Sequence, residues 1–240
     1  MLKKNTSNNI KIVTFSTKDH LVGNIDNSLV EKISDFRAIG ISEGPKGNVD
    51  FVMSMPGDEV VIRLQLLGTQ NVSNALAAAA CAYSVGVSPG NIKKGLEATS
   101  PVAGRMQPVK GKNNSLLIDD SYNANPDSVR AAIDALSRWG SNTFLVLGDL
   151  GELGENEKVL HEELGVYARE KNIQHLITVG DLTKATHRSY GAGAIHCADH
   201  DEIIKTLNAM LDDKSVVLIK GSRVSKMDKV VAALKDVGEN

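Results

Sequence analysis

The chain has 240 residues, of which 42% are hydrophobic and 23% charged, and its formal net charge is −2. This composition is typical of a globular protein with one large or two smaller domains, and the lack of a clustered basic tract argues against a nucleic-acid partner. No stretch approaches the roughly 18 apolar residues of a membrane span, and the two cysteines match no disulfide or zinc spacing, so we expect a cytoplasmic protein without membrane insertion.

Residues 1–98 begin with short β-type runs separated by turns, and we expect them to form one domain. The runs are IKIVTF (10–15), FRAIGIS (36–42), VDFVMSM (49–55) and VVIRLQLLG (60–68). Glycine and proline breaks between the later runs favour hairpins, which predicts an antiparallel meander. From Asn71 the apolar period changes from 2 to about 3.6, which predicts a helix ending at Gly86, with a short helix after Pro89.

The second half of the chain follows a different pattern. Residues 99–109 contain two prolines, a glycine and no periodicity, which is typical of an interdomain linker. In residues 110–240, five apolar runs alternate with amphipathic segments: SLLID, TFLVLG, HLITVG, AIHCA and SVVLIKG. This pattern predicts an α/β domain with a Rossmann-like, mostly parallel sheet covered on both faces, in which ligands bind at the carboxyl ends of the strands.

The end of the first of these strands is the richest candidate site. Asn125 fits a helix N-cap and Pro126 the first helical position, but capping does not account for Asp119 and Asp120 at the ligand end of a buried strand. A carboxylate there can accept both ribose hydroxyls of a nucleotide. From residue types alone, a nucleotide site and a capped turn are both open.

Two other strand ends give weaker signals. Residues 148–154, GDLGELG, can bring backbone N–H groups to a phosphate, although a flexible turn is the favoured interpretation. Lys220 and Arg223 form a basic fork that suits phosphate or carboxylate, with a solvated loop as the alternative. The histidines show no metal spacing and are expected at the surface, so no metal site is predicted, and no G-x-x-x-x-G-K-[ST] phosphate loop is present.

Several segments, taken in order and spacing, resemble the bacterial Mur ligases, most of all the branch that adds D-alanyl-D-alanine to UDP-N-acetylmuramoyl-tripeptide. They are GTQNVSNALAA (68–78), GRM (104–106), DDSYNANP (119–126), GDLGELG (148–154) and KGSR (220–223). The resemblance implies an ATP-dependent amide ligase of peptidoglycan synthesis, and so of cell-wall biogenesis, cell shape and division, that works through an acyl phosphate. We expect the chain to be the C-terminal half of such an enzyme: the last part of the central domain, a linker and the C-terminal ligase domain. The UDP-sugar domain, the phosphate loop and most magnesium ligands would then precede Met1, and this half alone would be inactive.

The resemblance also assigns roles to residues. It implies that Asn71 and Asn74 face the adenine of ATP, that Arg105 reaches the γ-phosphate, and that Asp120 holds the ribose. Tyr122 and Asn125 would complete the nucleotide wall. Lys220, Ser222 and Arg223 would lie at the edge of the cleft, and Arg105 and Lys220 are the expected catalytic residues. The family commonly has histidine where this chain has Gln70, so a charged role there is in doubt.

Two other functions are left open. One is another acid–amino-acid ligase of the superfamily, similar to folylpolyglutamate synthase, and the other is a noncatalytic nucleotide-binding module. The expected partners are ATP, Mg²⁺, UDP-N-acetylmuramoyl-tripeptide and D-alanyl-D-alanine, and the protein is expected to be a monomer.

Overall fold

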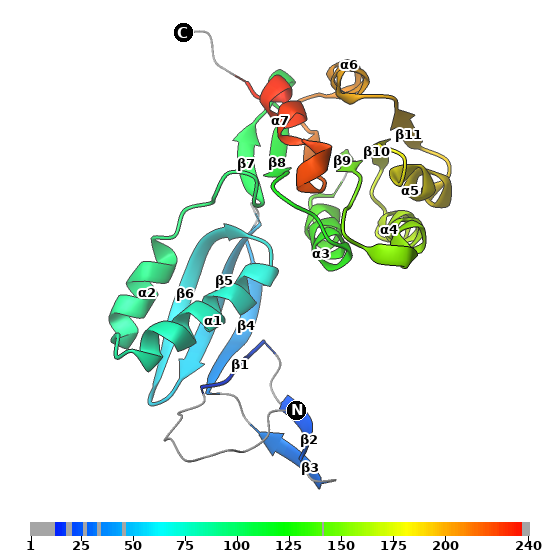
Figure 1. Ribbon diagram of the computed structural model, residues 1–240. Helices are drawn as coiled ribbons and strands as arrows, with labels where there is room; N and C mark the ends of the chain where they lie inside the picture. Colours follow the sequence, from blue (N-terminus) through cyan, green and yellow to red (C-terminus); the bar gives the residue numbers. More distant parts are fainter. Residues whose placement is uncertain are drawn as a thin grey trace. The chain divides into compact units, whose positions relative to one another are not determined.

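The computed structural model describes residues 13–17, 21–25, 28–32, 35–44, 47–140 and 142–236. The chain divides between Ser100 and Pro101 into two compact units (Figure 1). Among the described helices, none is long and apolar enough to cross a membrane. The division falls inside the predicted linker 99–109, of which Gln107 onward is already strand, and the linker assignment itself stays a prediction.

Unit 1 is built on a four-stranded sheet with the order β1-β4-β5-β6. Its strands are β1 (Phe15–Ser16), β4 (Phe36–Glu43), β5 (Asn48–Met55) and β6 (Asp58–Leu67). As predicted, β4, β5 and β6 form an antiparallel meander. The prediction is wrong at β1, which pairs parallel to β4, and residues 10–12 of that expected strand lie outside the described residues. A separate antiparallel pair is formed by β2 (Leu21–Ile25) and β3 (Ser28–Lys32).

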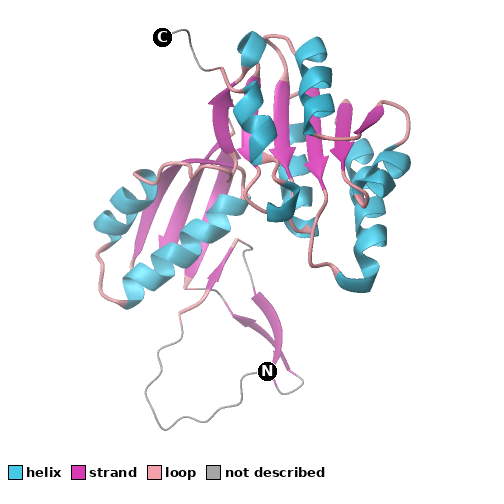
Figure 2. Cartoon of the chain, turned by 45° about the horizontal axis from the view of Figure 1, so that its top comes forward, coloured by secondary structure: helices cyan, strands magenta, loops and turns pink. Residues whose placement is uncertain are grey.

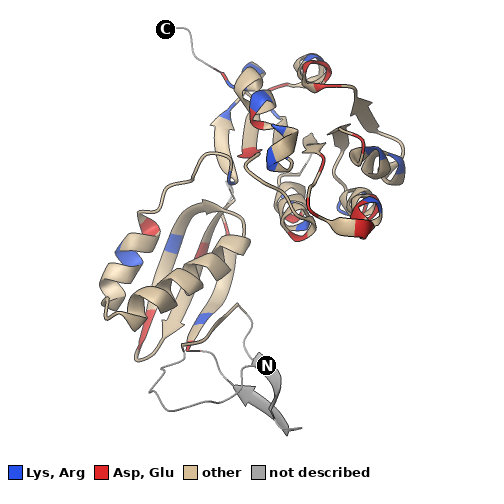
Figure 3. Ribbon diagram, in the orientation of Figure 1, with Lys and Arg blue, Asp and Glu red and all other residues tan. Residues whose placement is uncertain are grey.

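Two helices, α1 (Gln70–Ser84) and α2 (Pro89–Glu97), cover one face of this sheet (Figure 2). Helix α1 has no charged residue (Figure 3), and its alanines allow the strands to approach closely. Val72, Leu76 and Ala79 of α1 are fully buried against the sheet. This apolar packing fixes the amino end of α1, where Asn71 and Asn74 lie.

Unit 2 contains a six-stranded sheet with the order β11-β10-β9-β12-β8-β7. Its strands are β7 (Gln107–Lys110), β8 (Leu116–Asp120), β9 (Thr143–Gly148), β10 (His175–Val179), β11 (Ala194–Cys197) and β12 (Val216–Lys220). Only the edge strand β7 is antiparallel to its neighbour. The predicted Rossmann-like α/β domain with a mostly parallel sheet is therefore confirmed.

Helices cover both faces of this sheet (Figure 2). They are α3 (Pro126–Ser137), α4 (Glu157–Glu170), α5 (Thr183–Tyr190), α6 (His200–Met210) and α7 (Asp228–Leu234). The core between the sheet and helices α6 and α7 includes Val217, Ile219, Leu207 and Leu234, all fully buried. Because the strands are apolar along their length, the polar residues Asp119, Asp120 and Lys220 come only where β8 and β12 end.

Candidate functional site

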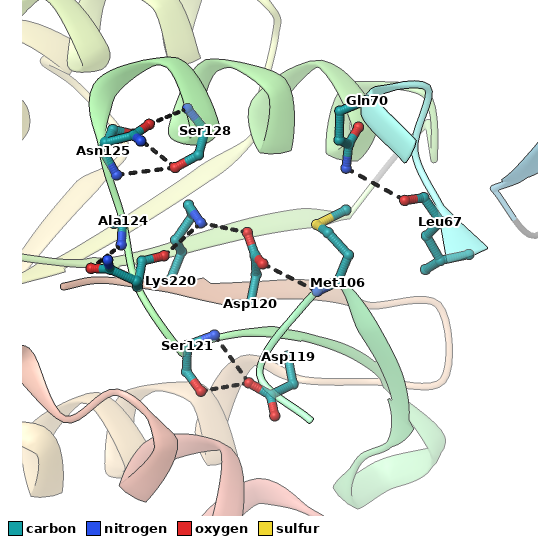
Figure 4. Close-up of polar contacts among 11 residues, drawn as sticks. Leu67, Gln70, Met106, Asp119, Asp120, Ser121, Ala124, Asn125, Ser128 and Lys220 are labelled. Atoms are coloured by element: carbon teal, nitrogen blue, oxygen red, sulfur yellow. Dashed lines mark hydrogen bonds and ion pairs between the residues drawn. The ribbon is translucent and has the colours of Figure 1, made fainter. Parts of the chain in front are cut away.

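The carboxyl ends of β8 and β12 lie side by side and bring together acidic and basic residues from distant parts of the chain. The two strands are parallel, with Lys220 in register with Asp120 and Ile219 with Asp119. In such sheets the carboxyl ends of the strands are where ligands bind. The polar contacts of this edge, shown in Figure 4, define the candidate site.

Asp120 and Lys220 form a buried ion pair. The ammonium Nζ of Lys220 lies 2.6 Å from Oδ2 of Asp120, and the lysine is 2% exposed. Nζ also donates to the carbonyl of Asn123 at 2.9 Å, while Oδ1 of Asp120 accepts the backbone N–H of Met106 at 3.1 Å. Burial raises the pKa of Asp120, and Lys220 and the Met106 N–H oppose that rise. The pair ties β8 to β12, to the turn before α3 and to the segment before β7.

Asp119 binds the segment 104–106 at Gly104, whereas Asp120 binds it at Met106. Its Oδ2 accepts the N–H of Gly104 at 3.0 Å, and its Oδ1 accepts the hydroxyl of Ser121 at 2.6 Å. The carbonyl of Gly104 in turn accepts the N–H of Tyr122 at 3.0 Å. Gly104 has φ +75° and a Cβ there would lie 3.0 Å from Cβ of Tyr122, so only glycine fits without strain. Residues 104–106 are thus attached to the end of β8 in unit 2.

Arg105 projects from this anchored segment and contacts an exposed aromatic ring. Its guanidinium carbon lies 4.4 Å from the ring centre of Tyr122, whose exposed fraction is 47%. The guanidinium carbon of Arg223 lies 5.9 Å from the same ring centre. Both are cation–π contacts. The structure therefore brings Arg105, Tyr122 and Arg223 together, and the roles expected of Arg105 and Tyr122 toward ATP stay predictions.

Asn125 is part of a capping box at the start of α3. Its Oδ1 accepts the N–H of Ser128 at 2.8 Å, and its own N–H donates to the Ser128 hydroxyl at 3.0 Å (Figure 4). Pro126 occupies the first helical position, as expected. These bonds account for Asn125 as a cap, and its role in a nucleotide wall stays a prediction.

Asn71 and Asn74 lie in unit 1, at the amino end of α1. The amide nitrogen of Asn71 donates to the carbonyl of Leu67 at 2.8 Å, and that of Asn74 donates to Oδ1 of Asn71 at 3.1 Å. Gln70 also donates to the Leu67 carbonyl, at 3.4 Å (Figure 4). The pair is prearranged within unit 1, and its predicted contact with adenine stays a prediction.

The glycine-containing turn after β9, expected to be flexible, is held by hydrogen bonds at Asp149 and Leu150. Oδ1 of Asp149 accepts the N–H of Thr183 at 2.9 Å, and its carbonyl accepts the N–H of Ser222 at 3.0 Å. The N–H of Leu150 donates to Nε2 of His161 at 3.1 Å, while Nδ1 of His161 contacts the Glu157 carbonyl at 2.6 Å. These two contacts fit a neutral imidazole that donates from Nδ1.

His161 was not singled out by the sequence. Its exposed fraction is 0%, so the expectation that the histidines lie at the surface is wrong for this residue. The sequence signal that could have indicated its burial is its spacing from Leu164 and Ala168, which places all three on the buried face of α4. Within the described residues, no three His, Cys, Asp or Glu side chains are grouped so as to hold a metal ion.

Comparison with protein families identifies both halves of the chain. Residues 1–82 match the Mur ligase middle domain, and residues 104–223 match the Mur ligase glutamate ligase domain. The UDP-N-acetylmuramoyl-tripeptide–D-alanyl-D-alanine ligase of Escherichia coli (strain K12) is 38% identical over 207 residues, 85% of this chain and 45% of that protein. The protein of the same name from Haemophilus influenzae (strain ATCC 51907 / DSM 11121 / KW20 / Rd) is 38% identical over 208 residues, 84% of this chain and 45% of its own length.

Solved structures agree with these matches. MurF from Acinetobacter baumannii superimposes with a TM-score of 0.76 at 32% identity, covering 83% of this chain and 44% of that one. The MurF ligase from Thermotoga maritima, crystallised in complex with ADP, gives a TM-score of 0.72 at 23% identity, covering 83% of this chain and 46% of its own, and supports the fold alone. The chain spans about half the length of the curated relatives it matches.

Proposed function

The chain belongs to the Mur ligase family, and on that premise we propose that it supplies the nucleotide- and amine-binding half of an ATP-dependent ligase of peptidoglycan precursor synthesis. The observation that carries the proposal is the run of two Mur ligase domains, in order, within a chain that is 38% identical to ligases named for joining D-alanyl-D-alanine to UDP-N-acetylmuramoyl-tripeptide. The ATP-dependent activity, both substrates and Mg²⁺ belong to the proposed whole enzyme.

The proposed reaction makes an amide bond in two steps. A carboxylate oxygen of the tripeptide attacks the γ-phosphorus of ATP, which releases ADP and gives an acyl phosphate. The amine of D-alanyl-D-alanine then attacks the acyl carbon, loses a proton and expels phosphate. Both steps concentrate negative charge on phosphate oxygens, and the acyl phosphate must be kept from water, so the site needs fixed cations and closure.

Arg105 is proposed to supply one such cation at the γ-phosphate. Asp119 and Asp120 hold the backbone on either side of it through the N–H groups of Gly104 and Met106, so the guanidinium starts from a fixed point on unit 2. This attachment supports the proposal that Arg105 belongs to unit 2 and moves with it, and does not lie on a free linker. Preorganised charge of this kind needs no rearrangement at the moment of reaction.

The nucleotide is proposed to contact Asp120, Tyr122 and Asn125, with Asn71 and Asn74 at the adenine. Each carboxylate oxygen of Asp120 already accepts one donor, Lys220 or Met106, which leaves a lone pair on each for a ribose hydroxyl. Lys220 is buried and committed to Asp120, so we propose a positioning role for it in place of direct contact with substrate. Mg²⁺ is proposed to bind mainly to other parts of the whole enzyme, because within the described residues no three His, Cys, Asp or Glu side chains are grouped so as to hold it.

The alternatives make different chemical predictions. A ligase similar to folylpolyglutamate synthase would accept L-glutamate as its amine, and the run DSYNANP (120–126) argues against it. A noncatalytic module would bind nucleotide without turnover in any longer form. A monomeric state, a cytoplasmic location and the lack of nucleic-acid partners stay predictions.

A coupled assay of ADP release tests the proposal in the longer protein to which this chain is proposed to belong. ADP release should require ATP, Mg²⁺, UDP-N-acetylmuramoyl-tripeptide and D-alanyl-D-alanine together, and should fall at least about a hundredfold in Arg105→Ala, as for the loss of one charge-stabilising group. Arg105→Lys should recover part of the rate, because a point charge lacks the two-pronged grip of a guanidinium. Release supported by L-glutamate, or unchanged in Arg105→Ala, would contradict the assignment. The isolated chain should stay at background.

A further inference from the structure

The sequence suggested that Lys220 and Arg223 form one basic fork. In the structure the two cations lie in different environments. Lys220 points inward, is 2% exposed, and has its charge matched by Asp120. Arg223 is exposed and lies over the ring of Tyr122. Because Lys220 is already neutralised, Arg223 is the member of the fork that remains able to attract an anion.

The backbone beneath Arg223 is held firmly although its side chain is exposed. Arg223 opens a short 3-10 turn (Arg223–Ser225). Just before it, the N–H of Ser222 donates to the carbonyl of Asp149, and the hydroxyl of Ser225 donates to the carbonyl of Ser222 at 2.7 Å. A ring nitrogen of His200 contacts the Ser225 carbonyl at 2.9 Å. The position from which the guanidinium projects is therefore fixed by β9, β12 and α6.

Two glycines, Gly148 and Gly221, allow the 3-10 turn to pack closely against the ends of the strands. A Cβ on Gly148, at the end of β9, would lie 2.8 Å from Sδ of Met227 and 2.8 Å from Cβ of Ser225. A Cβ on Gly221 would likewise lie too close to side-chain atoms of Ser225 and Met227. The turn thus folds directly over the strand ends and brings Arg223 to the ring of Tyr122.

Arg105 and Arg223 therefore present two guanidinium groups around one ring, each from an anchored backbone. In the described part of the chain, neither has a carboxylate partner within ion-pair distance, and the carboxylates of Asp119 and Asp120 accept hydrogen bonds from other groups. Exposed like charges repel weakly, and cation–π contact offsets that repulsion only modestly. A bound anion would relieve the repulsion and use the fork geometry of both groups.

We propose that Arg223 is an oxyanion-binding residue which, with Arg105 around Tyr122, forms a two-guanidinium subsite. Its ligand class is a group with two or more terminal oxygens, that is, a carboxylate or a phosphate. The identity of that group rests on the proposed function: the phosphate would come from the nucleotide or the acyl phosphate, and the carboxylate from the free end of the amine substrate. The binding chemistry itself rests only on the two arginines.

The test is an NMR titration of the arginine Nε–H signals of the 240-residue chain. The probes are inorganic phosphate, D-alanyl-D-alanine and its carboxamide, which lacks the terminal carboxylate. Phosphate or the dipeptide should shift the Nε–H signals of Arg105 and Arg223 along one saturable curve, in the millimolar range expected for an exposed site, and added salt should weaken the binding. Shifts with phosphate alone assign the subsite to phosphate, and shifts with the dipeptide but not its carboxamide assign it to carboxylate.

Matched variants separate a specific site from general charge attraction. Arg223→Gln should weaken binding about tenfold, as expected for the loss of one charge-assisted hydrogen bond, and Arg223→Lys should restore part of it. Lys229→Gln removes the same charge from the exposed surface of α7 and should leave binding unchanged. The proposal is overturned if neither anion shifts the Arg223 signal, or if Arg223→Gln and Lys229→Gln weaken binding equally. Since no turnover is measured, a failed ligase assay leaves this result standing.

Discussion

Lys220→Met removes the cation of the buried ion pair while keeping a long, apolar side chain, and it should strongly destabilise unit 2. The variant leaves the carboxylate of Asp120, whose side chain is 13% exposed, with only the Met106 N–H as donor. Breaking a buried pair by removing one partner costs about 3–5 kcal/mol, because an uncompensated charge remains. For a protein of this size that corresponds to a fall of about 6–20 °C in melting temperature.

Urea unfolding followed by the fluorescence of Trp139, the single tryptophan, measures this effect in unit 2. Asp120→Asn and the double variant complete a mutant cycle, in which the two changes should couple by more than about 1 kcal/mol. Lys184→Met is the matched control: its ion pair with Asp181 spans 2.8 Å, but the side chains are 51% and 93% exposed. That control should change stability by less than about 1 kcal/mol.

The pH dependence of Lys220→Met gives an independent check. Burial already raises the pKa of Asp120, and removing the opposing ammonium should raise it further. The folded variant then binds a proton more tightly than the unfolded chain, so it should gain stability as the pH falls through the raised pKa. A stabilising role of the buried ion pair is excluded if the unfolding free energy of Lys220→Met lies within about 1 kcal/mol of the parent's and the cycle shows no coupling.

Three further predictions concern local packing, capping and protonation. Gly148→Ala should lower the free energy of urea unfolding by about 1–3 kcal/mol because its Cβ would lie within 2.8 Å of neighbouring side chains, whereas Gly151→Ala, with its nearest contact at 3.8 Å, should be nearly neutral. Asn125→Ala should lower it by about 1 kcal/mol by removing the α3 cap, and Asn125→Asp should not; equal losses would exclude the cap. Burial and the neighbouring His187 lower the pKa of His196, so stability should be lost as the pH falls below about 6.5, and a pH-stability curve of His196→Gln as steep as the parent's would contradict this.

Much of unit 2 follows from local sequence. The five apolar runs become β8 to β12, and each following amphipathic segment becomes a helix, because a short apolar run and an apolar period of 3.6 are both properties of neighbouring residues. The N-cap at Asn125 was equally readable, since an N-cap acts within one helical turn. In unit 1 the hairpin breaks gave the meander β4 to β6 for the same reason.

The site contacts depend on strand order, which local patterns do not specify. Lys220 meets Asp120 across 100 residues of sequence because β12 inserts between β8 and β9. A strand order that followed the sequence would have put β9 beside β8 and left Lys220 elsewhere. This is why the sequence suggested an exposed basic fork, whereas Lys220 is buried and Arg223 alone is exposed.

The same limitation applies to His161 and to β1. His161 is buried because the turn after β9 folds onto α4 and presents the Leu150 N–H to its ring, a contact that residue type does not predict. Strand β1 pairs parallel to the first residues of β4, and the direction of that pairing depends on a distant partner strand, which the apolar run 10–15 does not specify. Expectations that depended on contacts between distant parts of the chain were therefore the ones that failed.

This chain is proposed to supply the nucleotide- and amine-binding half of a D-alanyl-D-alanine-adding ligase. The most direct test is mass spectrometry of the product made by the longer protein from ATP, UDP-N-acetylmuramoyl-tripeptide and an equimolar mixture of D-alanyl-D-alanine and L-glutamate. One product is expected: the tripeptide substrate joined to D-alanyl-D-alanine with loss of water, with one ADP and one phosphate formed for each amide. A product that contains L-glutamate, or ATP consumption without amide, would contradict it.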